Sequence, residues 1–325
     1  MRILIFSPKT PDSRAGNFTT ASRWKKLLQS AGHRVQIGFD STLTNFDDVD
    51  LLIGLHATRS AKMILRFRKR HPNRSAMIAL TGTDLYRDLT RPRKPATAIK
   101  ALDQCSRILI LQPLMAKRLP KKWRRKSQLV MMDVAAKAKP NRTWVPNRAN
   151  VCVIGHLRYE KDPFRAEMAV RSLPDEFSIR VSHAGASLIP ADPKGIRIKQ
   201  RQHRNENWKW LNSIPQSQVL KLMQRSDLLV NSSRIEGAPN VLFEAMAVGL
   251  PMLLSNIDGH VGVMGQGYPG YFPVGDTRKL RELLIQTAHD KSYRQKLANA
   301  TKAQAKTYRA GQEKAALAEI TERRP

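Results

Sequence analysis

Short apolar runs alternate with helical stretches along almost the whole chain, and this alternation restricts the fold more than any other feature. In the first half, strands are predicted at residues 2–7, 34–39, 50–55, 76–80, 107–111 and 128–131, with helices at 19–31 and 60–70. In the second half, strands are predicted at residues 151–154, 178–183, 196–199, 227–231 and 251–255, and the chain is helical from residue 277 onward. Such alternation is typical of parallel sheets that carry helices on their faces. We therefore predict an α/β protein with two Rossmann-like, doubly wound domains.

The chain of 325 residues is long enough for two hydrophobic cores, and its composition indicates where they divide. Residues 137–150 are rich in Lys, Pro, Asn and Arg and are predicted to form a linker. We expect an N-terminal domain at residues 1–145 and a C-terminal domain at 146–304, with a helix at about 305–325 that packs back onto the first domain. Ligands of doubly wound sheets bind beyond the C-terminal ends of the strands, so a central cleft between two facing domains is predicted.

The sequence lacks the signals of several other classes of protein. The apolar run at residues 1–7 is too short for a signal peptide or a membrane span, and no other run approaches that length. Cys105 and Cys152 show neither metal-ligand spacing nor a redox motif, which favours reduced thiols, a cytoplasmic location and no metal site. No Gly-x-Gly-x-x-Gly sequence follows the first strand, so a dinucleotide-dependent dehydrogenase is not expected and no cofactor is predicted.

The net charge of +31 is extreme and unevenly distributed. Residues 1–150 hold 31 basic and 9 acidic side chains, a net charge of +22, with dense basic runs at 66–70 and 117–126. Such a potential attracts nucleic acid, an acidic membrane surface or a small phosphorylated substrate, while a solvated basic face explains each run equally well. No zinc spacing, RNA-binding aromatic pattern or helix-turn-helix accompanies the charge, so nucleic acid is not an expected partner. Membrane association stays open.

The strongest functional signal lies at residues 226–251, where a predicted strand leads through a Gly/Pro loop into a helix. Pro239 suits the first helical position, Gly249 suits the C-terminal cap, and Pro251 prevents continuation of the helix. Unpaired N–H groups and the helix dipole point outward at such a helix start. The segment therefore predicts a site for an anion.

Two glutamates in this segment, Glu236 in the loop and Glu244 in the helix, have seven residues between them. A phosphate could bind the amides of Asn240 and Val241 beside Gly237, while Glu244 reaches a neutral hydroxyl group. A sugar nucleotide presents this combination of groups. Two glutamates also occur at this spacing by chance, and Glu244 alone would be interpreted as a solvated helix residue. The surrounding Gly, Pro and Asn residues favour the binding site.

A second loop with cationic side chains follows the strand at residues 151–154. The strand ends at Gly155, and Arg158 and Lys161 come directly after it. Two cations there could neutralise a departing diphosphate, because Arg supplies a fork of donors and Lys supplies a point charge. Alone the pair is unremarkable, but beside the helix start at Asn240 it supports a diphosphate site.

Polar and small residues also follow the predicted strands of the first half. They are Gly16, Asn17, Thr20, His56, Arg59 and Asp84. Gly16 would let the backbone approach a ligand, His56 and Arg59 would lie at the rim of the cleft, and Asp84 could hold a sugar hydroxyl. A plain helix cap, a structural histidine and an Asx turn are the alternatives for these positions, and they stay open.

The two glutamates, followed by Glu-Ala-Met-Ala-x-Gly-x-Pro, resemble the nucleotide-sugar motif of GT-B glycosyltransferases of the family-4 type. Other runs are similar to a narrower group, the selenosugar synthases of selenoneine biosynthesis. These runs are Gly16-Asn17 with Thr20-Ala21-x-Arg23-Trp24, Leu55-His56-Ala57-x-Arg59-Ser60-Ala61, residues 80–88, Asn231-Ser232-Ser233-Arg234-x-Glu236-Gly237, and Tyr268-Pro269-Gly270-Tyr271-Phe272-Pro273-Val274-Gly275-Asp276. They occur in order over nearly the whole chain.

The resemblance implies a GT-B fold and a specific reaction. That group joins a UDP-sugar, typically UDP-N-acetylglucosamine, to selenium delivered as selenophosphate, and the product is a 1-seleno-sugar. The resemblance places Arg158 and Lys161 at the UDP diphosphate and Glu244 at the ribose. It implies catalytic roles for Glu236, His56 and Asp84, and an acceptor-side position for Gly16, Asn17, Thr20 and Arg59.

One departure and three alternatives accompany this interpretation. In the selenosugar synthases Gly237 would be followed by Gly-Ala-Asn, whereas this chain has Ala238-Pro239-Asn240, which could alter the nucleotide preference. The alternatives are a family-4 transferase that builds a cell-surface glycan, a UDP-sugar epimerase, and a non-catalytic protein that binds nucleic acid. The first of these would require an apolar and basic membrane-facing surface, for which the region of Trp123 is the candidate.

Overall fold

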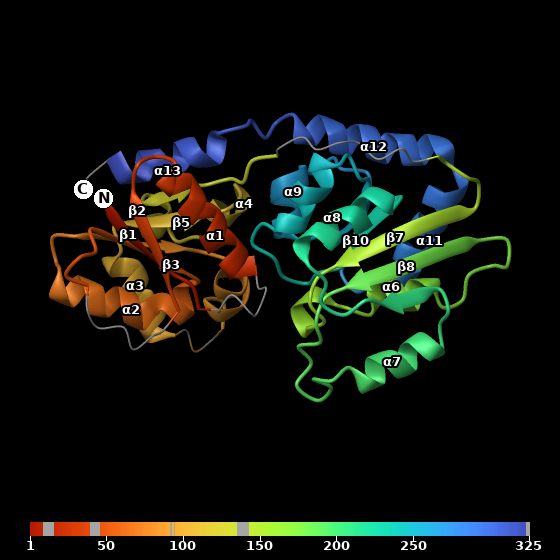
Figure 1. Ribbon diagram of the computed structural model, residues 1–325, viewed down its shortest axis with the longest axis horizontal. Coiled ribbons are helices and arrows are strands. Elements are labelled where there is room, and N and C mark those ends of the chain that lie inside the picture. The colour runs from red at the N-terminus through yellow and green to blue at the C-terminus, as the bar shows by residue number, and fades with distance from the viewer. Residues whose placement is uncertain (9–15, 40–45, 92, 94, 135–142, 323–325) are drawn as a thin grey trace. The chain divides into compact units, whose positions relative to one another are not determined.

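The computed structural model describes residues 1–8, 16–39, 46–91, 93, 95–134 and 143–322. The chain divides into two compact units, whose elements are labelled in Figure 1. The first unit holds Met1–Asp133, Glu236–Asn240 and Arg309–Pro325, and the second holds Val134–Ile235 and Val241–Tyr308. Residues 137–142 of the predicted linker lie outside the described residues. The end of that predicted linker is already a strand, β7, which starts at Arg148.

The first unit is built on a parallel sheet of six strands in the order β2-β1-β3-β4-β5-β6. The strands are β1 (Arg2–Phe6), β2 (Arg34–Gly38), β3 (Leu51–Leu55), β4 (Ser75–Ala79), β5 (Arg107–Ile110) and β6 (Ser127–Leu129). The helices are α1 (Gly16–Gln29), α2 (Ala57–Arg70), α3 (Ala96–Gln104), α4 (Leu114–Lys117), α5 (Lys121–Arg124) and α13 (Gln312–Glu322). The neighbours of β1 are β2 and β3, so the topological switch point lies between β1 and β3. All six strands coincide with predicted ones to within a few residues.

Helices cover both faces of this first sheet, which explains why its strands appear in the sequence as unbroken apolar runs. Successive side chains of a strand point to opposite faces. Ile3 and Ile5 therefore pack with Trp24 of α1 and with residues of α13, whereas Leu4 and Phe6 pack with residues of α2 and α3. Figure 1 shows the same arrangement, with α1 and α13 on one side of the sheet and α2 and α3 on the other.

The last helix of the chain, α13, is fixed to the first sheet by apolar and polar contacts. Leu317 is buried in the same core cluster as Trp24. Glu313 is also buried, and its carboxylate accepts hydrogen bonds from Trp24 Nε1 at 2.7 Å and from Arg23 Nε at 2.8 Å. Asp133 accepts from the backbone N–H of Glu313 at 2.9 Å and so satisfies a donor at the start of the helix.

The second unit is built on another parallel sheet of six strands, in the order β12-β11-β10-β7-β8-β9. Its strands are β7 (Arg148–Ile154), β8 (Ser178–Ala184), β9 (Trp208–Trp210), β10 (Leu228–Asn231), β11 (Met252–Ser255) and β12 (Tyr271–Phe272). Its helices are α6 (Arg165–Val170), α7 (Ile196–His203), α8 (Gln216–Arg225), α9 (Asn240–Ala247), α10 (Asp258–Met264), α11 (Thr277–His289) and α12 (Lys291–Ala305). The first residue of α9, Asn240, is grouped with the first unit. After β9 the chain crosses to β10 on the other side of β7, so the switch point lies between β7 and β10.

The predicted secondary structure is wrong in one place of the second unit. Residues 196–199 were predicted to be a strand but open helix α7, and the edge strand is β9 instead. The sequence Ile-Arg-Ile-Lys is too short to distinguish a period of two from a helical period, and only Ile198 of its two isoleucines is buried. Residues 258–276, which contain several glycines, form α10 and β12. Burial of His260 and Val263 outweighs the low helix propensity of the glycines in α10.

The structure contradicts one requirement of the membrane-associated alternative. Trp123 is not on the surface, because its ring is buried in the core cluster beneath α2 and α3, and its Nε1 donates to Asp103 at 2.6 Å. The exposed residues around it are Lys117, Arg118, Pro120, Lys121, Lys122, Arg124 and Arg125. Among the residues that the structure describes, no helix combines the length and hydropathy that a membrane span needs.

Candidate functional site

The first candidate site lies in the second unit, beyond the C-terminal ends of β7 and β10. These neighbouring strands flank the switch point of the sheet, where ligands bind in open α/β sheets. The loop after β7 spans residues 155–162 and is called the cationic loop below. The loop after β10 holds it in place: Ser232 Oγ donates to Asp162 O at 3.0 Å, and Arg234 N donates to Glu160 O at 2.8 Å.

The cationic loop is anchored on its other side by β8 and the residues after it. Leu157 pairs with Ser187 in an isolated parallel bridge that extends the β7–β8 ladder. His183, at 1% exposure, lies beneath the loop with Nε2 at 3.0 Å from Gly155 O. The carbonyl can only accept, so Nε2 carries the proton. Burial lowers the pKa of His183 to about 4, and the ring is therefore neutral at pH 7.

The charges of the cationic loop are partly balanced by its own carboxylates. Arg158 lies 3.9 Å from Glu160, and its side chain is partly exposed. Asp162 adopts a left-handed conformation and pairs with Arg165 at 2.9 Å and with Arg234 at 3.5 Å. The structure thus places the predicted pair Arg158 and Lys161 in one anchored loop, and it adds Arg234, which the sequence interpretation left without a role.

Helix α9 starts at Asn240, one residue after Pro239, and carries the second predicted glutamate. Glu244 is half-buried and accepts a hydrogen bond from Gln216 Nε2 at 2.8 Å, which fixes one of its two oxygens. The side chain of Val241 is buried, so only its amide is available to a ligand. The other predicted residues of this segment, Glu236, Gly237 and Asn240, are grouped with the first unit.

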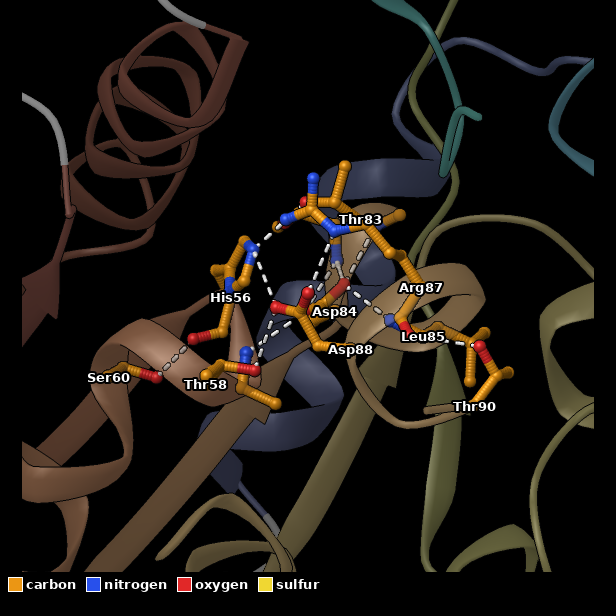
Figure 2. Close-up of polar contacts among 12 residues, drawn as sticks. His56, Thr58, Ser60, Thr83, Asp84, Leu85, Arg87, Asp88 and Thr90 are labelled. Atoms are coloured by element: carbon orange, nitrogen blue, oxygen red, sulfur yellow. Dashed lines mark hydrogen bonds and ion pairs between the residues drawn. The ribbon is translucent and has the colours of Figure 1, made fainter. Parts of the chain in front are cut away.

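The second candidate site lies in the first unit, where β3 and β4 end. His56 follows β3 at the switch point and has a φ of 73°, a conformation that costs a residue other than glycine of order 1 kcal/mol and is frequent at functional sites. Its ring is 2% exposed, and Nε2 lies 3.0 Å from Thr83 Oγ1 and 4.0 Å from Asp88 Oδ2. Figure 2 shows His56 directed toward Thr83 and Asp88. Nδ1 has no hydrogen-bond partner within the described part of the chain.

Burial and neighbouring charges set the protonation of this cluster. Burial lowers the pKa of His56; Asp84 and Asp88 oppose the shift, and Arg59 and Arg87 add to it. The ring is therefore neutral at pH 7. Burial acts to raise the pKa of Asp88, but hydrogen bonds from Arg87 and Thr58 outweigh it and hold that pKa below its ordinary value. A neutral imidazole beside an ionised carboxylate can accept a proton, as a general base does.

Asp84 has a different environment from the one that the sequence suggested. It is fully buried, and its oxygens accept hydrogen bonds from the backbone N–H groups of Ala57, Thr81, Gly82 and Leu85 at 2.8 to 3.0 Å. These bonds cap the start of α2 and fix the turn after β4. The geometry therefore supports a positioning role for Asp84 and does not support contact with a sugar hydroxyl.

The remaining predicted residues of the first unit differ in accessibility. Gly16 and Arg59 are exposed and Asn17 is half-buried, so all three can reach a ligand. Thr20 is buried on the inner face of α1, so its side chain is not available to an acceptor, contrary to the prediction. Asp88, Thr83 and Thr58 were not predicted, although Asp88 lies four residues after Asp84, a spacing that places two residues on one helical face.

The second half of the chain matches the model of a known family. Residues 135–304, just over half of the chain, match the family model described as glycosyl transferases group 1. The chain belongs to that family. It is also 24% identical to the glycosyltransferase 1 domain-containing protein 1 of Xenopus tropicalis over 272 residues, which are 78% of each chain. The prediction of a glycosyltransferase is thereby confirmed.

Solved structures give the same result for the fold of this glycosyltransferase. Sucrose-phosphate synthase from Thermosynechococcus elongatus has a TM-score of 0.76 at 12% identity and matches over 99% of this chain and 97% of its own. Anabaena HepE, in complex with UDP-glucose, has a TM-score of 0.73 at 15% identity over 99% of both chains. The predicted α/β fold of the GT-B type, with two parallel sheets and flanking helices, is confirmed. The predicted cleft, domain boundaries and residue roles stay predictions.

Proposed function

We propose that this glycosyltransferase transfers a hexosyl group from a UDP-sugar, with UDP-N-acetylglucosamine as the donor, to selenophosphate. The product would be a 1-seleno-sugar of the kind used in selenoneine biosynthesis. The donor half of the proposal is supported by the anchored cationic loop at the switch point of the second sheet. It is also supported by the solved complexes of Anabaena HepE with UDP and with UDP-glucose. The acceptor half rests on the similarity of residues 16–24, 55–61, 80–88 and 268–276 to selenosugar synthases.

In this reaction the donor site has to stabilise the charge that develops on the departing UDP. We assign that role to Arg158 and Lys161 and to the amides at the start of α9. Glu244, whose Oε1 accepts from Gln216, would bind the ribose hydroxyls. Glu236 would lie near the transferred sugar. Because Glu160 and Asp162 already neutralise part of the loop, the diphosphate would add to a preorganised arrangement of charges.

The chemical step needs position more than a strong base, because selenophosphate is already a good nucleophile. An electron pair on selenium attacks the anomeric carbon, the bond from that carbon to the UDP oxygen breaks, and UDP leaves with its electron pair. The phosphoryl group stays on selenium until water cleaves the P–Se bond and releases phosphate. Neutral His56 beside ionised Asp88 is our candidate for handling a proton on the acceptor side, with Asp84 as the residue that positions this turn.

The deciding experiment supplies the protein with UDP-N-acetylglucosamine and selenophosphate and follows UDP release together with mass spectrometry for the seleno-sugar. We expect both products in equal amounts and neither in the absence of selenophosphate. Arg158→Ala and Lys161→Ala should each lower kcat/KM by about 100-fold or more while leaving the melting temperature unchanged, because charge stabilisation in the transition state is lost. Release of free sugar without selenophosphate would identify an epimerase or hydrolase. Near-normal turnover in both variants would refute the donor-site assignment.

A further inference from the structure

Arg234 is a cation of the second unit for which the proposed reaction has so far no role. It lies three residues after the end of β10, in the loop that holds the cationic loop in place, and its side chain is 32% exposed. Its backbone N–H donates to Glu160 O at 2.8 Å, so the position of its Cα is tied to the loop that carries Arg158 and Lys161. The start of its side chain is therefore fixed at the switch point of the sheet.

Two further contacts orient the guanidinium group of Arg234. Its central carbon lies 5.1 Å from the ring centroid of Tyr159, within the range of a cation–π contact. Its Nη2 lies 3.5 Å from Asp162 Oδ1, whereas Asp162 has a closer partner in Arg165 at 2.9 Å. A contact with an aromatic ring does not use the guanidinium N–H groups as donors to an oxygen, so they can still donate to an acceptor. At 3.5 Å, Asp162 interacts only weakly with the N–H groups of Arg234.

The Nε of Arg234 is the atom that most directly indicates a missing hydrogen-bond acceptor. This nitrogen is buried, and it has no hydrogen-bond partner among residues 1–8, 16–39, 46–91, 93, 95–134 and 143–322. A buried donor that is left unpaired costs about 1–3 kcal/mol, so such a group is expected to meet an acceptor in the functional state of a protein.

We propose that Arg234 is a third cationic ligand of the donor diphosphate and that Tyr159 holds its guanidinium in place. The proposal rests on the proposed function of the cationic loop and extends it. Arg158 and Lys161 come from the loop after β7, whereas Arg234 comes from the loop after β10. The diphosphate is thus bound from both strands that flank the switch point. Tyr159 is 74% exposed, so the ring serves as an accessible support for the guanidinium and not as part of the core.

Calorimetric titration of UDP into variants of the full chain tests this assignment. Arg234→Gln should weaken UDP binding by about 10- to 100-fold, the effect of one charge-assisted hydrogen-bonding group, and should weaken UMP binding less. Arg234→Lys, which keeps the charge but loses Nε and the planar guanidinium group, should recover only part of the affinity. Arg278→Gln on α11 is the matched control, because Arg278 is 90% exposed and pairs with Glu282 at the surface. The UDP affinity of this variant should match that of the wild type within about twofold.

Tyr159 supplies the second test. Tyr159→Phe should bind UDP as the wild type does, whereas Tyr159→Ala should lose about 3- to 10-fold, because only the aromatic face is needed. Melting temperatures separate a loss of fold from a loss of ligand contact. Arg234→Gln with normal UDP affinity, alongside impaired Arg158→Ala, would overturn the role of Arg234 and leave the donor site standing. Normal affinity in Arg158→Ala and Lys161→Ala as well would instead refute the proposed donor site.

Discussion

Replacing His183 by glutamine should remove a specific acid sensitivity from the second unit. His183 is buried beneath the cationic loop and binds Gly155 O through Nε2. Burial lowers its folded-state pKa to about 4, against 6.5 for an ordinary histidine. The unfolded chain therefore binds this proton more tightly than the folded protein does. Stability from the neutral ring is fully present above pH 6.5 and is lost as the pH falls toward 4.

The size of the effect follows from the two pKa values. Each pH unit between 6.5 and 4 changes the free energy of unfolding by up to about 1.4 kcal/mol per proton. Between pH 7.5 and pH 5 the contribution of His183 falls by about 2 kcal/mol, and by pH 3.5 it has fallen by about 3 kcal/mol. Glutamine keeps an N–H donor for Gly155 O but does not titrate. The variant should therefore lack this part of the pH dependence.

Urea unfolding of both proteins at a series of pH values from 4 to 7.5 measures the difference. The informative quantity is the free energy of unfolding of the wild type minus that of His183→Gln, because every other titrating group is common to both and cancels. We expect this difference to fall by about 2 kcal/mol between pH 7.5 and pH 5, whatever its absolute value at neutral pH. Parallel curves for the two proteins would show that His183 is not buried as a neutral ring.

Two further predictions concern buried carboxylates of the first unit. Glu313→Ala should lower the free energy of unfolding by about 3 kcal/mol, since it leaves Arg23 and the indole N–H of Trp24 without their buried partner. Thermal unfolding with limited proteolysis of α13 would detect this loss of stability. Glu313→Gln should lower the free energy of unfolding less, and an unchanged Tm in the alanine variant would contradict the packing of α13. Asp84→Ala should lower the free energy of unfolding by about 3 kcal/mol, because it removes the acceptor for Ala57 N and three other amides, and Asp84→Asn should lower it less. A normal Tm combined with a large fall in kcat for Asp84→Asn would instead indicate contact between Asp84 and the sugar.

Candidate site residues could be proposed from the sequence where residues close in the chain act together. Arg158 and Lys161 are candidates because they share one loop after a strand, and Glu244 is a candidate because a strand, a loop and a helix start follow one another there. The role of Asp84 could not be predicted in the same way. Its sequence neighbours suggested a polar turn. Its carboxylate accepts hydrogen bonds from four backbone N–H groups, and these come from segments that meet only when β3 and β4 are paired.

The sequence by itself determined that this chain forms two parallel sheets with flanking helices, because strand periodicity, helix punctuation and turn residues all act within a few positions along the chain. Tertiary structure decided which residues share a site. The cation–π contact of Arg234 with Tyr159, the approach of Asp88 to His56 and the burial of Glu313 against Trp24 each join segments that come together only when the sheets are packed. Such contacts depend on strand order and on side-chain burial, and local patterns in a sequence record neither.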